Sequence, residues 1–442
     1  MARTAVEASS NRSPPGIPKH LRPIPCNLPS YELPPGIDVS LHIVAETGDL
    51  VLQLEDVGLG LDEKFRVSID CLRKNSQYYD SMLDAEKFGE GIAIKKKSEE
   101  LSAKYGPSTT PPLDELPTIT MLEIPEINHR VTSTITLMEL FLLILHGKTP
   151  TWPFRPPESM QSLAQLMLIA DRFSAVEVTK RYVYENNITT SGYIHSLASA
   201  RRKDLQLRCK LLAGLYLGES EWIRLGSAKL IVEGSHQWSQ GLNSREDVGH
   251  VPAWYHLPGG FEEELTARRQ ALLDTISSIQ KHFVCLYSSK ELQCKKGYSN
   301  SQECDSFHLG EMVKFFLRKG TLDMQNIYTD HDGREYEGDI TELIAQLKEC
   351  PTYQVDSNHS HCGVRQRMAP LLYWLTPKEH VGICLQCWND DRLEESWLEK
   401  PTGGKWTNST NDSKRRTKCE EHRAAKAMYT AEERNWTPPP QY

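Results

Sequence analysis

Two segments of this sequence have apolar patterns that must pack against each other, and they constrain the fold more than any other feature. The first predicts a hairpin of two strands over 49–67 and then helices over 68–83. The second predicts a strand at 119–124 and amphipathic helices between 137 and 173. Strands with one apolar face need helices to cover them, so the two segments together predict one α+β domain.

Short motifs at the start of this domain resemble those of the BTB/POZ family. Asp49 stands where the family has an aspartate that opens the first strand. The family segment F-x-V-H-x-x-x-L is matched by Phe65, Val67 and Leu72. Ser68 replaces the histidine of that segment.

Two later motifs extend the resemblance over residues 43–184. The family's apolar helix before a Y-T-G turn is matched by residues 137–145, which are followed here by His146 and a glycine. The family's L-A-D-K-Y helix is matched by residues 169–173. The resemblance implies a domain that binds other proteins, including a second copy of the chain or a cullin scaffold, and that carries no catalytic chemistry.

Composition divides the rest of the chain. The predicted parts are a disordered arm at 1–40, the BTB/POZ-like domain at 41–190, a helical region at 191–345, a Cys/His-rich module at 346–398 and a disordered tail at 399–442. The arm holds eight prolines, and the tail is polar and rich in Gly, Asn, Ser and Lys. Inside the domain, a polar insertion at about 88–116 contains Lys and Glu runs and predicts a mobile loop.

Cysteine and histidine spacing predicts one structural zinc site in the C-terminal part. The candidate ligands are Cys350, His359, Cys362, Cys384 and Cys387. Cys-x2-Cys places two thiolates on one turn, where both sulfurs can lie about 2.3 Å from Zn²⁺. His-x2-Cys offers a second pair with the same spacing, and zinc favours such mixed nitrogen and sulfur sets.

Five candidates for four coordination positions leave the ligand set open. The preferred set is Cys362, Cys384 and Cys387 with either Cys350 or His359. Other residues with suitable donors are His361, which could replace His359, the Cys419-x2-His422 pair, and Cys294 with Cys304, which flank a Gly-Tyr turn. The alternative interpretation is that these cysteines are small buried core residues. Disulfides are disfavoured, because eleven is an odd number of cysteines and we expect a reducing compartment.

Charge and motif content narrow the function classes. A formal net charge of −8 argues against nucleic acid as a partner, although the basic run at 414–418 allows a zinc-dependent DNA-binding regulator as an alternative. The chain shows neither a secretory signal nor an apolar run long enough for a membrane span. Catalytic motifs such as His-Glu-x-x-His or Gly-x-Ser-x-Gly are also missing.

The sequence therefore predicts an intracellular, non-enzymatic protein of the cytoplasm or nucleus that acts by binding other proteins. The alternative within the same fold is a substrate adaptor of a cullin-type ubiquitin ligase.

Overall fold

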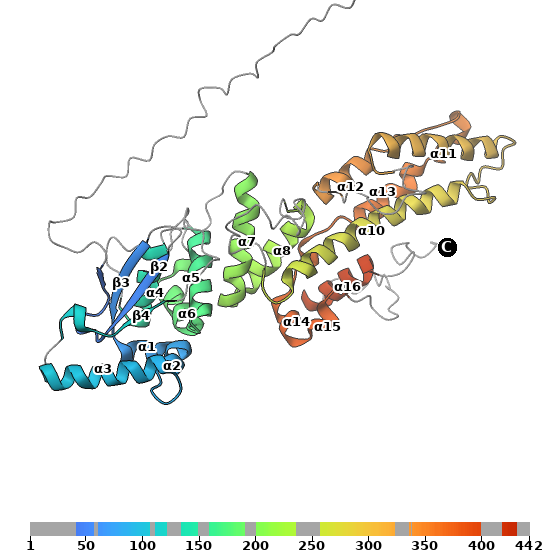
Figure 1. Ribbon diagram of the computed structural model, residues 1–442. Helices are drawn as coiled ribbons and strands as arrows, with labels where there is room; N and C mark the ends of the chain where they lie inside the picture. Colours follow the sequence, from blue (N-terminus) through green and yellow to red (C-terminus); the bar gives the residue numbers. More distant parts are fainter. Residues whose placement is uncertain are drawn as a thin grey trace, which may run out of the picture. The chain divides into compact units, whose positions relative to one another are not determined.

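The computed structural model describes residues 41–56, 61–106, 111–121, 134–148, 159–190, 200–235, 257–322, 336, 338–398 and 418–430. The predicted arm at 1–40 and most of the predicted tail lie outside these residues. The described residues are mostly helical, with one small mixed sheet near the N-terminal end (Figure 1). This is the predicted α+β class.

The sheet is built around a hairpin. Its strands are β1 (Leu41–Ile43), β2 (Leu50–Asp56), β3 (Leu61–Val67) and β4 (Thr118–Thr120), in the order β1-β3-β2-β4. Strands β2 and β3 are antiparallel, with Leu50 opposite Val67. Strand β4 runs parallel to β2, with Leu52 opposite Ile119. The predicted hairpin and return strand are therefore present, and the return strand needs the intervening helices as its crossover.

The sheet and its helices share one apolar core, which we call the N-terminal core. Its helices are α1 (Ile69–Asn75), α2 (Gln77–Met82), α4 (Thr134–Leu145), α5 (Met160–Arg172) and α6 (Val176–Glu185). On β2, Leu50, Leu52 and Leu54 all point into this core, as the period of two requires.

The predicted mobile loop at 88–116 is wrong, because most of it forms helix α3 (Gly89–Tyr105). Leu101 of α3 packs on Val51, which lies on the opposite face of β2 from the N-terminal core. Lys95 and Lys96 lie on the exposed side of the helix, while Ile94 is buried. The charged run is thus the solvated face of an amphipathic helix. The apolar face of this helix is narrow, so charged residues dominate the composition of the segment.

Helix α5 contributes to two cores. Leu166 and Ile169 belong to the N-terminal core. Leu163 and Met167, on another face, belong to a larger core formed by the C-terminal helices. The apolar surface of this amphipathic helix is therefore wider than one interface needs. The reason is that α5 packs on α7 as well as on α4.

The described residues of the C-terminal region form helices joined by loops and turns. Its helices are α7 (Ala200–Leu217), α8 (Ser220–Glu233), α10 (Phe261–Tyr287), α11 (Ser301–Arg318), α12 (Ile340–Lys348), α13 (Val364–Trp374), α14 (Leu385–Asp390), α15 (Arg392–Glu395) and α16 (Lys418–Thr430). Residues from α5 to α16 share one core, and it continues across the predicted boundary at 346.

The longest helix, α10, packs on α8, α11, α13 and α16. It buries an arginine as well as its apolar stripe. Arg268 is fully buried, and its Nε donates to Glu264 Oε1 (2.6 Å) while its Nη2 donates to Glu395 Oε1 (2.8 Å). Its Nη1 donates to two backbone carbonyls, of Val381 and Gly382, so the guanidinium is held by charged and neutral acceptors.

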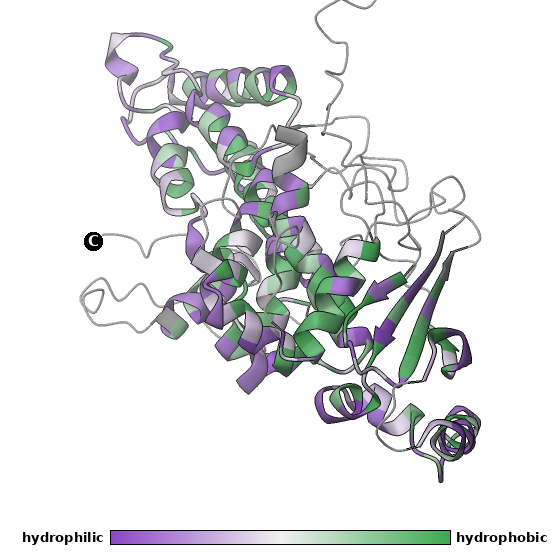
Figure 2. Cartoon of the chain, turned by 90° about the vertical axis from the view of Figure 1, so that its left-hand side faces the viewer, coloured by the Kyte–Doolittle hydropathy of each residue, from purple (hydrophilic) through white to green (hydrophobic). Residues whose placement is uncertain are grey.

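Helix α16 corrects the predicted disordered tail over 418–430. Its residues Ala425 and Tyr429 are buried in the C-terminal core, despite the polar composition around them. Most described helices carry both polar and apolar residues (Figure 2). Among them, none combines the length and the apolar character that crossing a bilayer requires.

We expect Leu101→Ala to destabilise the protein by about 2–5 kcal/mol, because it removes a buried side chain that covers one face of β2. Lys96→Ala, on the exposed side of the same helix, is the matched control and should cost less than about 0.5 kcal/mol. Urea unfolding measures both. Equal, small effects of the two substitutions would mean that α3 does not stabilise the sheet.

His42 on β1 predicts a pH dependence. Its Nδ1 lies 2.8 Å from Glu139 Oε2 and its Nε2 lies 3.1 Å from Glu63 Oε2. The hydrogen bond to Glu139 raises the His42 pKa above 6.5 against the opposing effect of burial. A raised pKa means that the stabilisation is complete below pH 6.5 and is lost as pH rises through the folded-state pKa.

We therefore expect the difference in melting temperature between wild type and His42→Gln to be largest below pH 6.5 and to shrink at higher pH. Thermal melts at a series of pH values measure it. A difference that does not change with pH would show that protonated His42 contributes nothing to stability.

Candidate metal centres

The structure gathers eight Cys and His side chains into two sets of four. The first cluster is Cys294, Cys304, His359 and Cys362, and the second cluster is Cys384, Cys387, Cys419 and His422. Within each cluster the potential ligand atoms all lie within 4.8 Å of one another. Each set could therefore hold one metal ion.

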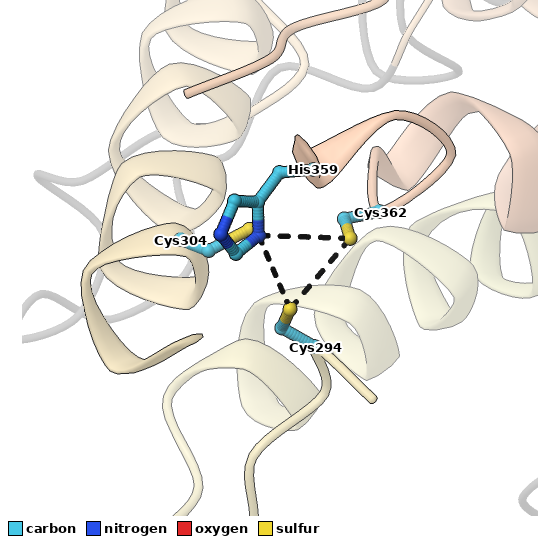
Figure 3. A group of neighbouring side chains, drawn as sticks. All are labelled: Cys294, Cys304, His359 and Cys362. Carbon is cyan, nitrogen blue, oxygen red and sulfur yellow. Dashed lines mark hydrogen bonds between the residues drawn. The ribbon is translucent and has the colours of Figure 1, made fainter. Parts of the chain in front are cut away.

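The first cluster is assembled from three separate segments (Figure 3). Cys294 lies in the loop after α10, and Cys304 lies in the first turn of α11. His359 and Cys362 lie just before α13, where the backbone turns at His361 with a φ of 70°. All four ligand side chains belong to buried residues.

The distances in the first cluster fit a tetrahedral ion. The sulfurs of Cys294 and Cys362 are 3.7 Å apart, and Cys294 Sγ is 3.3 Å from His359 Nδ1. Two sulfurs that each lie 2.3 Å from one tetrahedral ion are about 3.8 Å apart. The pair is far too widely spaced for a disulfide, which needs about 2.05 Å, and both cysteines are free thiols.

The His359 ring is oriented for metal binding through Nδ1. Its other nitrogen, Nε2, lies 2.9 Å from Asn300 Oδ1, an acceptor, so Nε2 carries the proton and the Nδ1 lone pair faces the sulfurs. Asn300 is itself held by Asp356, because its Nδ2 donates to Asp356 Oδ2 (3.2 Å). A metal-bound imidazole usually donates its other ring N–H to a hydrogen-bond acceptor that fixes its orientation, and here Asn300 supplies that acceptor.

Backbone contacts hold the two cysteine loops in place. The Asp305 carboxylate accepts hydrogen bonds from the backbone N–H groups of Gln293 (2.6 Å) and Cys294 (2.9 Å). On the other side, the Tyr287 hydroxyl donates to the Cys362 carbonyl (3.0 Å). The first cluster is therefore supported by side chains that lie outside the set of potential ligands.

The thiols of the first cluster differ in acidity. Burial raises the pKa of Cys294, but hydrogen bonds to its sulfur outweigh burial and lower that pKa to about 7. The donors are the backbone N–H of Lys296 and the side chains of Ser301 and Cys362. Burial raises the pKa of Cys304 and Cys362. Metal binding here must displace protons and so depends on pH.

The second cluster joins two elements. Cys384 is the N-cap residue of α14, and Cys387 lies in its first turn. Cys419 and His422, three residues apart, lie on one side of α16. Burial and then the neighbouring thiols of Cys419 and Cys384 raise the pKa of Cys387.

The predicted ligands are divided between the two clusters. His359 and Cys362 lie in the first, and Cys384 and Cys387 lie in the second, so they do not form the one shared site that was predicted and belong to two groups that could each hold a metal ion. Cys350 lies in neither. It is buried in the C-terminal core, which raises its pKa to about 11, and its thiol donates to the adjacent Pro351 carbonyl at 3.9 Å.

The residues that complete the two clusters differ in how clearly the sequence alone indicates them as metal ligands. Cys419-x2-His422 has a ligand spacing, but the polar composition around it pointed to disorder. Cys294 and Cys304 lack a short ligand spacing, so only the fold brings them together. His361, the proposed substitute, is exposed and its Nδ1 contacts Gln366 instead.

Comparison with models of known families, with curated proteins and with solved structures found no match.

Asn300→Ala is expected to weaken metal binding at the first cluster 10–100-fold, because His359 loses the group that orients it. The Asn300 side chain makes no capping hydrogen bond to α11, so the apo fold should change little. Gln302→Ala, exposed in the next turn, is the matched control. Competition with a chromogenic chelator measures both. Equal affinities in the two variants would mean that Asn300 plays no part in metal binding.

Proposed function

We propose that this chain is a non-enzymatic protein-interaction protein. Its N-terminal α+β region acts as a BTB/POZ-type binding module, and its C-terminal helical region is stabilised by Zn²⁺ at the first cluster. The observation that carries the proposal is the order and packing of the N-terminal elements.

The order of elements supports the BTB/POZ assignment. A two-stranded hairpin is followed by helices α1 and α2, a strand parallel to β2, and then helices α4, α5 and α6. The sequence predicted a hairpin, helices, a return strand and amphipathic helices up to residue 173 in this order, and α6 follows them. Helix α3, between α2 and β4, is an addition to it.

The two positions that depart from the family motifs contact each other. Ser68 and His146 are neighbours: the Ser68 N–H donates to His146 Nε2 (2.9 Å), and His146 Nδ1 donates to the Leu142 carbonyl (2.7 Å). A neutral imidazole can accept the first of these hydrogen bonds and donate the second. Burial lowers the His146 pKa, which favours this neutral form.

The donor set of the first cluster favours zinc in a structural role. Three thiolates and one imidazole form a soft tetrahedral set, which suits Zn²⁺ better than Mg²⁺ or Ca²⁺. All four positions are filled by protein side chains, whereas catalytic zinc keeps one position open for water or substrate. This argument, like the absence of catalytic motifs in the sequence, favours a non-enzymatic protein.

Affinity capture with the tagged full chain tests the interaction function. Phe65→Asp places a charge in the N-terminal core, where Phe65 is fully buried, and should disrupt the module. Glu99→Ala, on the exposed side of α3, is the control. We expect partner proteins or second copies of the chain to be retained by wild type and Glu99→Ala and reduced at least tenfold with Phe65→Asp.

Zinc content of the same samples shows whether the C-terminal region of Phe65→Asp is still folded. A cullin among the lost partners would identify the adaptor function. Partners retained by Phe65→Asp, or salt-sensitive DNA binding without any protein partner, would overturn the proposal.

A further inference from the structure

In the second cluster, potential metal ligands on α16 lie close to potential metal ligands on another element. No other group of this kind among the described residues includes a residue of α16. Two of its ligands come from the α14 turn and two from α16. Residues 399–417, which connect these elements, lie outside the described part of the chain. A metal ion in this cluster would therefore bind α16 directly to α14.

The two clusters differ in their exposure. All four residues of the first cluster are buried. In the second cluster only His422 is buried, and the three cysteines are partly exposed. A chelator or a competing thiol can reach a partly exposed site more easily, so metal in the second cluster should exchange faster.

Besides the potential ligands, packing holds α16 against α10, α15 and the turn at Glu379–Val381. Tyr429 is buried in this packing: its hydroxyl donates to the Leu375 carbonyl (2.8 Å), and its carbonyl accepts from Thr275 Oγ1 (2.9 Å). Two basic side chains, Arg423 and Lys426, contact Glu394 at the surface. A helix of 13 residues is marginal on its own in water, so α16 depends on such contacts.

Helix α16 also covers part of the buried ion-pair network. The Tyr429 ring stacks on Trp397 with centroids 5.8 Å apart. Trp397 in turn lies against the Arg268 guanidinium, 5.0 Å from the ring centroid. Release of α16 would uncover Trp397 and bring water close to the buried ion pairs.

We propose that Cys384, Cys387, Cys419 and His422 form a second, exchangeable Zn²⁺ site that fastens α16 to the C-terminal core. Three thiolates and one imidazole supply the same donor set as the first cluster, so the ligand is a thiophilic divalent ion. When the ion leaves, α16 detaches and the surface around Trp397 is exposed. The proposal concerns the second cluster alone and stands whether or not the first cluster or the N-terminal module behaves as proposed above.

Native mass spectrometry and hydrogen–deuterium exchange of the full chain test this site. Cys419→Ser combined with His422→Asn should lose one zinc ion relative to wild type. Amide exchange should rise at 418–430 and 392–398 and stay unchanged in α11. Cys285→Ser, an exposed thiol outside both clusters, is the control and should match wild type in both measurements.

A second variant separates metal loss from damage to α16 itself. Cys384→Ser combined with Cys387→Ser leaves the sequence of α16 intact and should release the same 418–430 segment. Brief treatment of wild type with EDTA should remove one ion first, with the same local rise in exchange, and added Zn²⁺ should reverse it.

Three results would overturn the proposal. The first is an unchanged zinc count in both double variants. The second is zinc loss without any rise in exchange at 418–430. The third is a rise in exchange throughout the C-terminal helices, because the ion would then support the whole region rather than one helix.

Discussion

Burial of helix α10 is the constraint on which the C-terminal region depends. Twenty-seven residues of helix span about 40 Å, and α8, α11, α13 and α16 all pack against it. Near its first residue, the Phe261 ring contacts Trp388, the residue after Cys387 of the second cluster. At its last residue, Tyr287 bonds the Cys362 carbonyl of the first cluster. The two clusters therefore lie near opposite ends of one helix.

Between these ends, the charged groups of α10 define which segments can pack on it. Taking Arg268 and Glu264 out of water is costly, and their mutual attraction offsets that cost only when every donor and acceptor finds a partner. The remaining partners come from 381–382 and 395–397. If these loops packed on α10 in another arrangement, a buried charge would be left unpaired. The network therefore favours the arrangement that is observed.

Helices and strands were predicted correctly where a segment of the sequence has one strong apolar pattern. A helical region was predicted over 191–345, and the inward residues Leu265, Leu272 and Ile276 of α10 have the helical spacing on which such a prediction rests. The hairpin and the parallel strand also follow from local patterns. Prediction failed at α3 and α16, where charged residues outnumber a narrow apolar face and composition alone indicates disorder.

The metal clusters show the same division. Ligand pairs two residues apart are local features, so His359 with Cys362 and Cys384 with Cys387 could be found from spacing. Which pairs share an ion depends on how distant helices pack. Cys294 and His359 are 65 residues apart, and their meeting is a property of the core that no local pattern encodes. Cys350 is the opposite error, because it was predicted as a ligand and is a buried core residue. From the sequence alone, a cysteine in an apolar core cannot be distinguished from a metal ligand.

The long separations within this core also set the order of events during synthesis. Thr275 on α10 bonds Tyr429, which is made 154 residues later. At 5–20 residues per second, a ribosome needs on the order of ten to thirty seconds to supply that partner. During this interval one side of α10 is translated but uncovered, and apolar residues there are open to contact with other chains. Between the emergence of α10 and that of α16, the nascent protein therefore lacks one of the helices that cover these residues.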